Sequence, residues 1–308
     1  MKYVFGIDIG GTTVKMGLFT VEGEMVEKWE IPTRCENGGE AVPADITEAI
    51  HKKMAEKKLT KEDVLGVGVG VPGPVKSDGT VLKCANLGWG IMNVNKVLGD
   101  MVGLPVYAAN DANVAALGEM WKGGGQGYKD MVMITLGTGV GGGIIVNGSV
   151  VAGSNGAGGE IGHMVVNPDE TRICGCGGHG HLEQYTSATG IAYLATEAVK
   201  NSDKKSELSK FEKITAKDVF DCAKAGDELA DEIVNKVCKI LAGALKCIVA
   251  SVDPEAFVIG GGVSKAGTII TDLVRKYYED NLLNAFQGKE FKLATLGNDA
   301  GMYGSAKL

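Results

Sequence analysis

The chain has 308 residues with a formal net charge of −7, and its Lys and Arg residues form no long cluster. Because nonspecific nucleic-acid binding needs a basic surface, this charge argues against a nucleic-acid partner. The 47 glycines are about twice the usual share, but they follow no three-residue period and only 7 prolines accompany them, which excludes collagen and low-complexity disorder.

No apolar run approaches the roughly 18 residues of a membrane span, and the first residues, MKYVFGID, show no signal-peptide pattern. The 7 cysteines are an odd number, which favours a reducing compartment over a disulfide framework. We therefore expect a cytoplasmic protein without a membrane partner.

The first part of the chain predicts alternating strands and helices. Residues 3–9 and 14–20 are β-prone runs on either side of a glycine turn, and residues 25–31 predict a third strand. Apolar residues four apart predict a helix over residues 42–58. The other elements expected here are strands at 64–71 and 105–109 and helices at 93–102 and 113–122.

The second part opens with a repeat of the first pattern. Residues 131–136 and 143–146 are strand-like and flank a second glycine turn, so we interpret both hairpins as copies of one device. Strands are also expected at 256–259 and 291–296, and helices at 187–200, 215–225, 227–251, 264–283 and 300–308. Strands that alternate with helices predict an α/β architecture.

Glycine-rich turns between strands are candidate phosphate sites. In the motif DIGGTT at residues 8–13, successive N–H groups are exposed, threonine hydroxyls add donors, and Asp8 is suited to hold Mg²⁺ through water. An ordinary tight hairpin is the alternative interpretation. The motif LGTGVGGG at residues 136–143 repeats the arrangement, and two such turns in equivalent halves favour a polyphosphate clamped between domains.

The sequence excludes two other nucleotide-binding motifs. No GxGxxG opens a helix and no GK[ST] occurs, which argues against a Rossmann site and a P-loop. A third glycine corner, IGGGV at residues 259–263, lies between a strand and a helix, where a planar base can approach the backbone. The glycines at 123–127 predict only a helix stop.

The motif ANDAN at residues 109–113 follows a predicted strand and opens a helix. Asp and Asn are preferred helix N-caps, so capping is one interpretation of these side chains. The other places Asp111 at the carboxyl end of a strand, where α/β proteins bind ligands, with its carboxylate ready to take a proton from a substrate hydroxyl.

Three of the four histidines gather with two cysteines in one glycine-rich stretch. Thiolates with imidazoles favour tetrahedral Zn²⁺, and a site with four protein ligands is structural. Because CxC spacing is less diagnostic than CxxC, a metal-free loop is the alternative. The candidate ligands are His163, Cys174, Cys176 and either His181 or His179.

The chain resembles the ROK family of sugar kinases and repressors in six ordered motifs: DIGGT at 8–12, NDAN at 110–113, LGTGVG at 136–141, EIGH at 160–163, CxCGxxGxxE at 174–183 and GGG at 260–262. The segments GVPGPV at 70–75 and NLGW at 86–89 are similar to the family's glucokinase branch. The resemblance implies an actin-like ATPase (ribonuclease-H-like) fold of two α/β domains, with ATP and sugar in the cleft between them.

A composition shift near residues 117–127 suggests where the two domains divide. We expect a small N-terminal α/β domain, 1–117 plus 297–308, and a large C-terminal α/β domain, 118–296, that carries the zinc loop.

The resemblance also implies residue roles, with Asp111 as the catalytic base. The expected sugar contacts are Gly73, Asn86, Asn110, Asp111, Glu160, His163 and Glu183. The expected ATP and Mg²⁺ contacts are Asp8, Gly10, Gly11, Thr12, Thr13, Lys15, Gly137, Thr138, Gly139, Gly260, Gly261 and Gly262. The expected structural Zn²⁺ ligands are His163, Cys174, Cys176 and His181, where His163 would use its other ring nitrogen for sugar. His181 replaces the family's third cysteine, which puts metal affinity and the position of Glu183 in question.

The sequence therefore predicts ATP-dependent phosphorylation of the glucose 6-hydroxyl by a homodimer or homotetramer. Kinases for N-acetylmannosamine, N-acetylglucosamine, fructose or allose are alternatives, and NLGW favours glucose. The acidic chain favours ATP over polyphosphate as donor. A sugar-responsive repressor would need an N-terminal helix-turn-helix, for which the seven residues before Asp8 leave no room.

Overall fold

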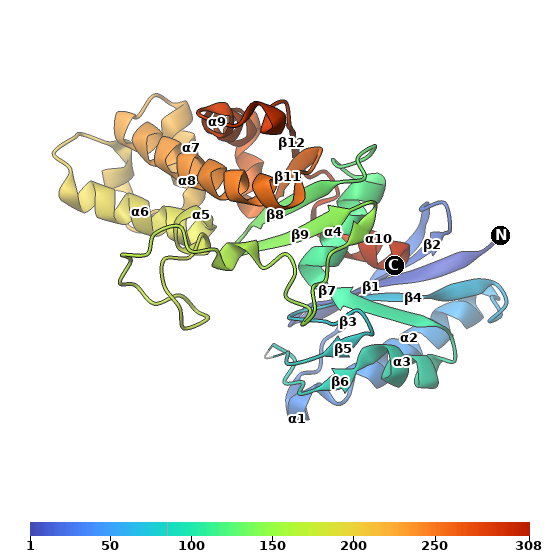
Figure 1. Ribbon diagram of the computed structural model, residues 1–308. Coiled ribbons are helices and arrows are strands. Elements are labelled where there is room, and N and C mark those ends of the chain that lie inside the picture. The colour runs from blue at the N-terminus through green and yellow to red at the C-terminus, as the bar shows by residue number, and fades with distance from the viewer. Residues whose placement is uncertain (85) are drawn as a thin grey trace. The chain divides into compact units, whose positions relative to one another are not determined.

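The computed structural model describes residues 1–84 and 86–308 and divides into two compact units (Figure 1). The first unit comprises Met1–Lys129, Gly143–Gly159 and Leu296–Leu308, and the second comprises Asp130–Gly142 and Glu160–Thr295. Both units contain strands and helices, which confirms the predicted α/β class.

The predicted domain division after residue 117 falls inside α4 (Asp111–Lys122), and all of α4 belongs to the first unit. The physical reason is packing, because α4 lies against α10 (Ala300–Lys307) at Gly118 and Gly304. The composition shift near residues 117–127 therefore marks the end of a helix, and the chain leaves the first unit only after Lys129.

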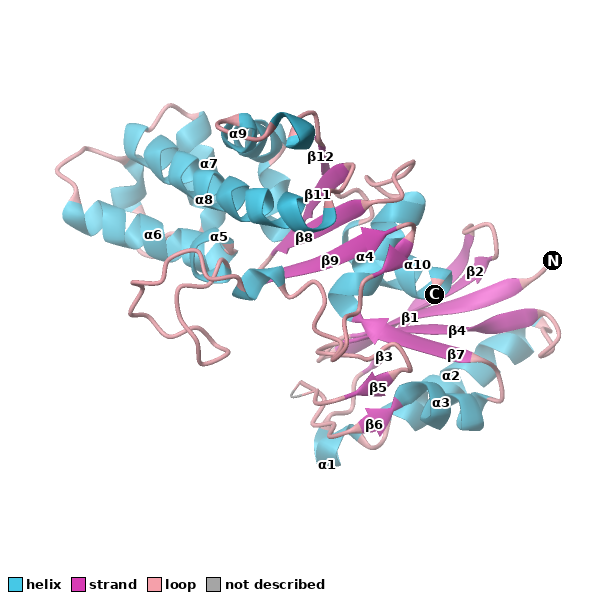
Figure 2. Cartoon of the chain, in the orientation of Figure 1, coloured by secondary structure: helices cyan, strands magenta, loops and turns pink. Residues whose placement is uncertain are grey.

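The first unit is built on a five-stranded sheet with the order β3-β2-β1-β4-β7 (Figure 2). Neighbours among β1, β2 and β3 are antiparallel, whereas β4 is parallel to both β1 and β7. The strands are β1 (Tyr3–Ile9), β2 (Thr13–Thr20), β3 (Met25–Pro32), β4 (Val64–Val71) and β7 (Val106–Asn110). Each lies within one residue of its predicted bounds.

The alternation of glycine and valine in β4 serves the two faces of this sheet, because successive side chains point to opposite sides. The valines are buried in a core with α2 (Val42–Lys57) and α3 (Val94–Val102). On the other face the glycines let α10 approach, and a Cβ on Gly68 would lie 1.7 Å from the Ser305 carbonyl oxygen.

A second five-stranded sheet has the order β10-β9-β8-β11-β12. Strand β11 is parallel to β8 and β12, and β10 is antiparallel to β9. The strands are β8 (Met131–Leu136), β9 (Val140–Val146), β10 (Ser149–Val150), β11 (Ala256–Gly260) and β12 (Glu290–Leu293). The helices of the second unit are α5 (Glu183–Thr186), α6 (Ala188–Asn201), α7 (Ala216–Lys224), α8 (Glu228–Val252) and α9 (Thr268–Glu279), and α8 packs against α6, α7 and α9.

The helix predicted over residues 264–283 is shorter than expected. A 3-10 turn spans Gly262–Ala266, and α9 begins only after Gly267, whose φ of +85° no helix can include. The remaining short elements are α1 (Glu36–Gly39), β5 (Thr80–Val81), β6 (Met92–Asn93) and 3-10 turns at Ile161–His163, Glu207–Lys210, Asn284–Phe286 and Gly297–Asp299.

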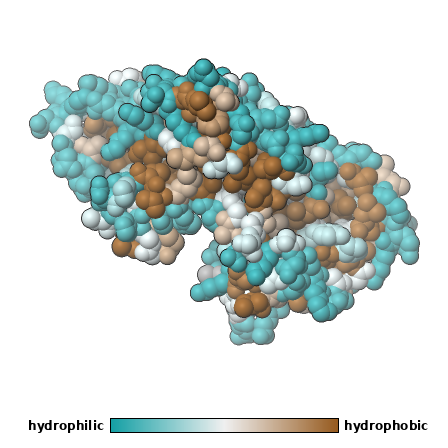
Figure 3. Space-filling model, in the orientation of Figure 1, coloured by the Kyte–Doolittle hydropathy of each residue, from teal (hydrophilic) through white to brown (hydrophobic). Residues whose placement is uncertain are grey.

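On the face that Figure 3 draws, hydrophilic and hydrophobic residues are interspersed. The 25-residue helix α8 is buried along one stripe and bears charged residues elsewhere. Within the described residues, no helix combines the length and the apolar character that crossing a bilayer requires.

Candidate active site and metal centre

The first glycine turn joins β1 to β2 and is closed by a hydrogen bond from the Gly10 N–H to the Thr13 carbonyl (3.0 Å). Gly11 and Thr12 are exposed at its tip. Thr33, just after β3, ties back the carbonyls of this turn: its hydroxyl donates to Gly10 (2.7 Å) and its N–H donates to Thr12 (2.9 Å). Because these carbonyls are engaged, the exposed tip is suited to present N–H groups to an anion.

The second glycine turn, between β8 and β9, is also closed by a backbone hydrogen bond, and it is one residue tighter. The Gly137 N–H donates to the Gly139 carbonyl (3.0 Å), and Thr138 is exposed at the tip. Here the Thr189 hydroxyl donates to the Thr138 carbonyl (2.8 Å), and the Ala188 N–H donates to the Gly137 carbonyl (2.8 Å). The predicted similarity of the two hairpins therefore extends to a threonine that secures each turn.

The third glycine corner, at the end of β11, lies beside the second turn. Gly261 has a φ of +82°, and a Cβ there would come within 2.5 Å of the Leu136 carbonyl oxygen. Only glycine meets both conditions, since other residues rarely adopt this φ and none could avoid the clash. Gly262 follows with open space around it.

Asp111 begins α4 directly after β7, at the carboxyl end of a strand as the sequence predicts. Its Oδ1 accepts hydrogen bonds from the Ala112 N–H (2.8 Å) and the Asn110 Nδ2 (3.0 Å). The helix cap is Asn110, whose Oδ1 accepts the Asn113 N–H (3.1 Å) and whose Nδ2 also donates to the Gly73 carbonyl (3.1 Å). Capping thus falls to Asn110, and Asp111 is held in place by its neighbours.

Asp8 is the second carboxylate of this region. It faces Lys15 across the β1-β2 pair. Its carboxyl group packs closely against Gly301, because a Cβ added to Gly301 would lie only 2.6 Å from Asp8 Cγ. Burial raises the pKa of Asp8 to about 6, while Lys15 lowers it and the negative charge of Asp111 raises it. Asp8 pairs with Gly70 of β4, and Gly70 pairs with Ala109 of β7, so Asp8 and Asp111 lie at the same end of the first sheet.

The predicted sugar-contact residue Asn86 lies in a segment anchored by Trp89, whose Nε1–H donates to the Gly39 carbonyl (3.0 Å). Asn86 is exposed. The thiol of Cys35 lies 3.5 Å from the carbonyl oxygens of both Gly11 and Asn86. Cys35 therefore links the Asn86 segment to the first glycine turn.

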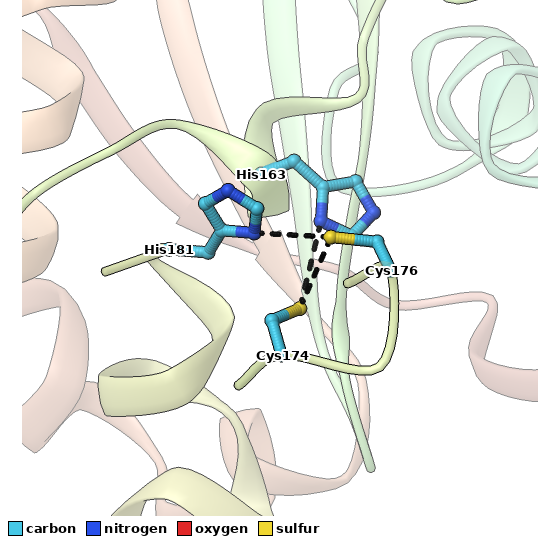
Figure 4. Close-up of side chains that lie close together, drawn as sticks. All are labelled: His163, Cys174, Cys176 and His181. Atoms are coloured by element: carbon cyan, nitrogen blue, oxygen red, sulfur yellow. Dashed lines mark hydrogen bonds between the residues drawn. The ribbon is translucent and has the colours of Figure 1, made fainter. Parts of the chain in front are cut away.

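The four predicted zinc ligands come together in the second unit (Figure 4). Their ligand atoms all lie within 4.8 Å of one another. The Cys176 sulfur is 3.5 Å from the Cys174 sulfur and 3.3 Å from His181 Nδ1, and His163 Nδ1 is 4.0 Å from the Cys174 sulfur. The geometry selects His181 rather than His179 for this cluster.

This donor set fits a tetrahedral zinc ion. Zinc bonds of about 2.3 Å to sulfur and about 2.0–2.1 Å to nitrogen require ligand atoms roughly 3.3–3.8 Å apart. Two separations, 3.3 and 3.5 Å, lie in this range, a third is 4.0 Å, and no pair is farther apart than 4.8 Å. Burial raises the pKa of the Cys174 thiol to about 12, so this thiol keeps its proton unless a cation lowers that pKa.

The other nitrogen of His163 faces away from the sulfurs and lies 4.0 Å from the Glu160 carboxylate. Glu183, at the start of α5, accepts the Cys174 thiol at Oε1 (2.7 Å). Its Oε2 lies beside the second glycine turn, 2.7 Å from where a Cβ on Gly139 would be. The second unit thus gathers three predicted sugar contacts, a glycine turn and the ligand cluster.

Residues 4–308 match the ROK family. The chain belongs to this family. It is 44% identical to a glucokinase of Halalkalibacterium halodurans, over 100% of this chain and 94% of that protein. It is 36% identical to a glucokinase of Thermotoga maritima, over 99% of this chain and 96% of that protein. A ROK family glucokinase from Streptomyces griseus, solved in complex with glucose and AMPPNP, matches with a TM-score of 0.74 and 32% identity, covering 99% of this chain and 98% of that one.

This membership confirms the actin-like ATPase fold that the six motifs implied. In the structure of this ROK protein, motif residues that are far apart in the sequence come together within each unit.

Sequence reasoning missed several residues of these sites. Thr33 and Thr189 hold the two turns, yet a lone threonine after a strand or inside a helix carries no recognisable signal. A cavity of about 350 Å³ beside Gly262 was also missed, because no motif marks its lining, which combines small and apolar residues with the charged Lys217, Asp221 and Lys265. Its lining includes Ala188, Thr215, Ala216, Phe220, Gly262 and Val263.

Proposed function

We propose that this ROK protein transfers the γ-phosphoryl group of ATP to the 6-hydroxyl of glucose. The observation that carries the proposal is the placement of Asp111 at the end of β7, at the same end of the sheet as Asp8 and held by two hydrogen bonds. The glucokinases of similar sequence support glucose as the acceptor and ATP as the donor.

In this proposal Asp111 accepts the proton of the 6-hydroxyl as that oxygen attacks the γ-phosphorus in line. The hydrogen bonds from Asn110 and the Ala112 N–H fix one carboxylate oxygen, which limits rotation of the base. Phosphoryl transfer depends mainly on positioning and charge neutralisation, so the fixed orientation of the base contributes more to the rate than its basicity does.

The two glycine turns hold the phosphates through backbone N–H groups, with hydroxyls of Thr12, Thr13 and Thr138 as further donors. Mg²⁺ neutralises negative charge on the phosphates when bound, and the Asp8 carboxylate is the group that would hold it, through water. Lys15 lies opposite Asp8 and donates to the Asn298 carbonyl (3.2 Å), which keeps a positive charge at the base of the first turn.

The adenosine part of ATP is assigned to the cavity beside Gly262. Small residues there leave room for a planar base, and Phe220 supplies an aromatic wall. The open space around Gly262 lets the base approach the backbone. Gly260 and Gly261 are proposed to contact the nucleotide as well; both glycines also pack against neighbouring strands.

The sugar hydroxyls are assigned to Glu160, His163 Nε2 and Glu183 in the second unit, and to Asn86, Asn110 and Gly73 in the first. Zinc, when bound to the Cys₂His₂ cluster, supplies a structural cross-link with no open coordination position. The cross-link would fix His163 by its Nδ1 and leave Nε2 for the sugar. We also propose that the protein is a homodimer or homotetramer, so its mass in light scattering should be two or four times the chain mass of 32.0 kDa.

The direct test of the base is Asp111→Asn, with Asp100→Asn as the control. Asp100 is an exposed α3 carboxylate that forms an ion pair with Lys96. We expect kcat to fall by at least about 100-fold in Asp111→Asn and to stay near the wild-type value in the control. Near-full turnover by Asp111→Asn would refute the assignment of the base.

The acceptor and donor are tested together by a coupled assay over a panel of hexoses with ATP or polyphosphate. We expect kcat/KM to be highest for glucose with ATP. Equal rates on N-acetylmannosamine or N-acetylglucosamine would instead favour the alternative kinases, and turnover with polyphosphate alone would overturn the choice of donor.

The metal assignment is tested by elemental analysis of the purified protein. We expect one zinc per chain in the wild type and little zinc in Cys176→Ser, because three remaining ligands bind more weakly. Cys247→Ser, which changes an exposed cysteine of α8, is the matched control. Sub-stoichiometric zinc in the wild type would favour a metal-free loop.

A further inference from the structure

A polar cluster that none of the roles above uses joins the loop after His163 to α5. Asn167, Glu170 and Arg172 come from the outgoing arm of that loop, and Gln184 and Tyr185 come from α5, which directly follows the returning arm. We call these five side chains the loop brace.

Glu170 is the centre of the loop brace. Its Oε2 accepts the Tyr185 hydroxyl (2.6 Å) and Arg172 Nη2 (2.6 Å), and its Oε1 accepts the backbone N–H of Thr171 and of Arg172 (both 3.0 Å). The Glu170 side chain is only 12% exposed. Arg172 and then Tyr185 hold the pKa of Glu170 down at about 2, so the carboxylate stays charged at neutral pH.

Two further contacts connect the arms. Asn167 Nδ2 donates to the Tyr185 hydroxyl (2.9 Å), and Gln184 Nε2 donates to the Arg172 carbonyl (2.9 Å). The Arg172 guanidinium stacks over the ring of Tyr193 on α6, 3.8 Å from its centroid. These contacts clamp the outgoing arm to the residues that directly follow Glu183.

The loop brace does not use the metal-ligating atoms. Gln184 contacts the ligand residue His181 through the backbone of that residue: Gln184 Oε1 accepts the His181 N–H, and the Gln184 N–H donates to the His181 carbonyl (both 3.0 Å). The four ligand atoms are instead the two cysteine sulfurs and Nδ1 of the two histidines. Two separate sets of atoms therefore hold this loop: the loop brace and the four metal-ligand atoms.

We propose that the loop brace positions Glu183 for the sugar and keeps the loop folded without the metal. Glu183, Gln184 and Tyr185 share the single turn of α5, so a shift of the braced residues moves Glu183 with them. Glu170 and Tyr185 are in this view positioning residues, since they act through Glu183. The part that concerns sugar affinity rests on the proposed function; the part that concerns folding of the loop does not.

The first experiment compares KM values in Tyr185→Phe and Glu170→Gln. Loss of a charged hydrogen bond should raise the KM for glucose about ten-fold, while kcat and the KM for ATP change less than about two-fold. Tyr193→Phe, which keeps the ring under Arg172, is the matched control and should leave all three constants unchanged. An equal rise of both KM values, or a fall of kcat alone, would overturn the positioning role.

The second experiment measures hydrogen exchange after the metal is removed with a chelator. The N–H groups of Val166 and Leu182, which bond across the arms to Gly180 and Met164, report on the loop (2.8 and 2.9 Å). In metal-free wild type they should exchange at least about ten-fold more slowly than in the metal-free double variant of Glu170→Gln and Tyr185→Phe. Equal exchange rates would overturn the metal-independent role. If the wild type phosphorylates no hexose, the proposed function fails and this measurement still decides the role of the brace in folding.

Discussion

Asp8 is a predicted site residue whose pKa departs from its ordinary value. A Cβ on Gly301 would come within 2.6 Å of the Asp8 carboxyl carbon, so any side chain larger than that of glycine would displace the carboxyl group. Burial raises its pKa from 3.8 to about 6. The charged form of this buried carboxylate therefore lowers the free energy of unfolding, and a cation bound beside it would offset that loss.

The pH dependence of stability tests this placement. Because the folded pKa is the higher one, the folded state binds more protons than the unfolded state between pH 3.8 and 6, and stability falls as pH rises through that window. The full cost above pH 6 is about 3 kcal/mol, and about half of it remains at pH 5. Asp8→Asn should therefore exceed the wild type in free energy of unfolding by about 3 kcal/mol at pH 8, and by clearly less at pH 5.

The measurement is urea denaturation at both pH values with a chelator present. Added Mg²⁺ should stabilise the wild type and leave Asp8→Asn unaffected, because the variant lacks the carboxylate. Parallel dependence of the two proteins on pH would show that the pKa of Asp8 is not raised.

The sequence predicted those parts of the site whose residues lie within a few positions of one another in the chain. The strand-end position of Asp111 and three members of the ligand cluster could be read from motifs of a few residues, whereas the residue pattern left His181 and His179 as alternatives for the fourth member. Contacts over long sequence separations could not: Cys35 meets the Asn86 carbonyl, and Thr189 meets Thr138, only because the fold returns the chain there. The loop brace was missed for the same reason, since Glu170 and Tyr185 are 15 residues apart in a stretch without periodicity.

At the scale of elements, glycine has a second use that the sequence analysis did not assign. Many glycines were interpreted as places where backbone meets ligand, yet Gly6 and Gly68 in the first sheet and Gly304 in α10 serve helix packing. A Cβ on Gly6 would lie 2.1 Å from the Met302 carbonyl oxygen. The predicted helix stop at residues 123–127 is also a packing device, because the buried carboxylate of Glu119 accepts the N–H groups of Gly124 and Leu296 (both 2.8 Å).

Gly304→Ala tests the packing of α10 on α4. A Cβ there would lie 1.5 Å from the Val114 carbonyl oxygen, so the two helices must separate. We expect a loss of about 3 kcal/mol or more in the free energy of unfolding, as for other overpacked cores. Gly243→Ala is the control, because Gly243 lies inside α8 with open space around it, and it should gain up to about 1 kcal/mol from helix propensity.

Both substitutions are measured by urea denaturation at one pH. Equal effects of Gly304→Ala and Gly243→Ala would mean that α10 adapts to the added methyl group, contrary to the close packing described.

Element types were predictable because strand and helix periods are local, whereas several element ends were not. Strand β9 begins at Val140, before the predicted start at residue 143, since pairing in the sheet imposes a strand on glycines with little strand preference. The predicted helix at 264–283 is interrupted where Gly267 takes a positive φ, a choice that glycine permits but does not require.

At the scale of the whole molecule, the net charge of −7 repels a polyanion such as ATP at long range. Long-range attraction cannot supply the affinity, so it must come from local groups: backbone N–H groups of the two turns, Lys15 and a bound cation. Binding of either substrate should then register as added stability of the entire chain, which links the site to a property of the whole protein.

Thermal unfolding with each substrate measures this linkage. At a ligand concentration about 100 times its Kd, the free energy of unfolding rises by about 2.7 kcal/mol, which corresponds to roughly 5 °C in Tm for a chain of this size. We expect such a shift with glucose and with ATP plus Mg²⁺, and a smaller one with N-acetylglucosamine. Glu183→Gln should lose most of the glucose shift and keep the ATP shift, because Glu183 is assigned to the sugar alone. A larger shift with the N-acetylated sugar would favour an N-acetylhexosamine kinase, and loss of both shifts in Glu183→Gln would indicate a general folding defect instead.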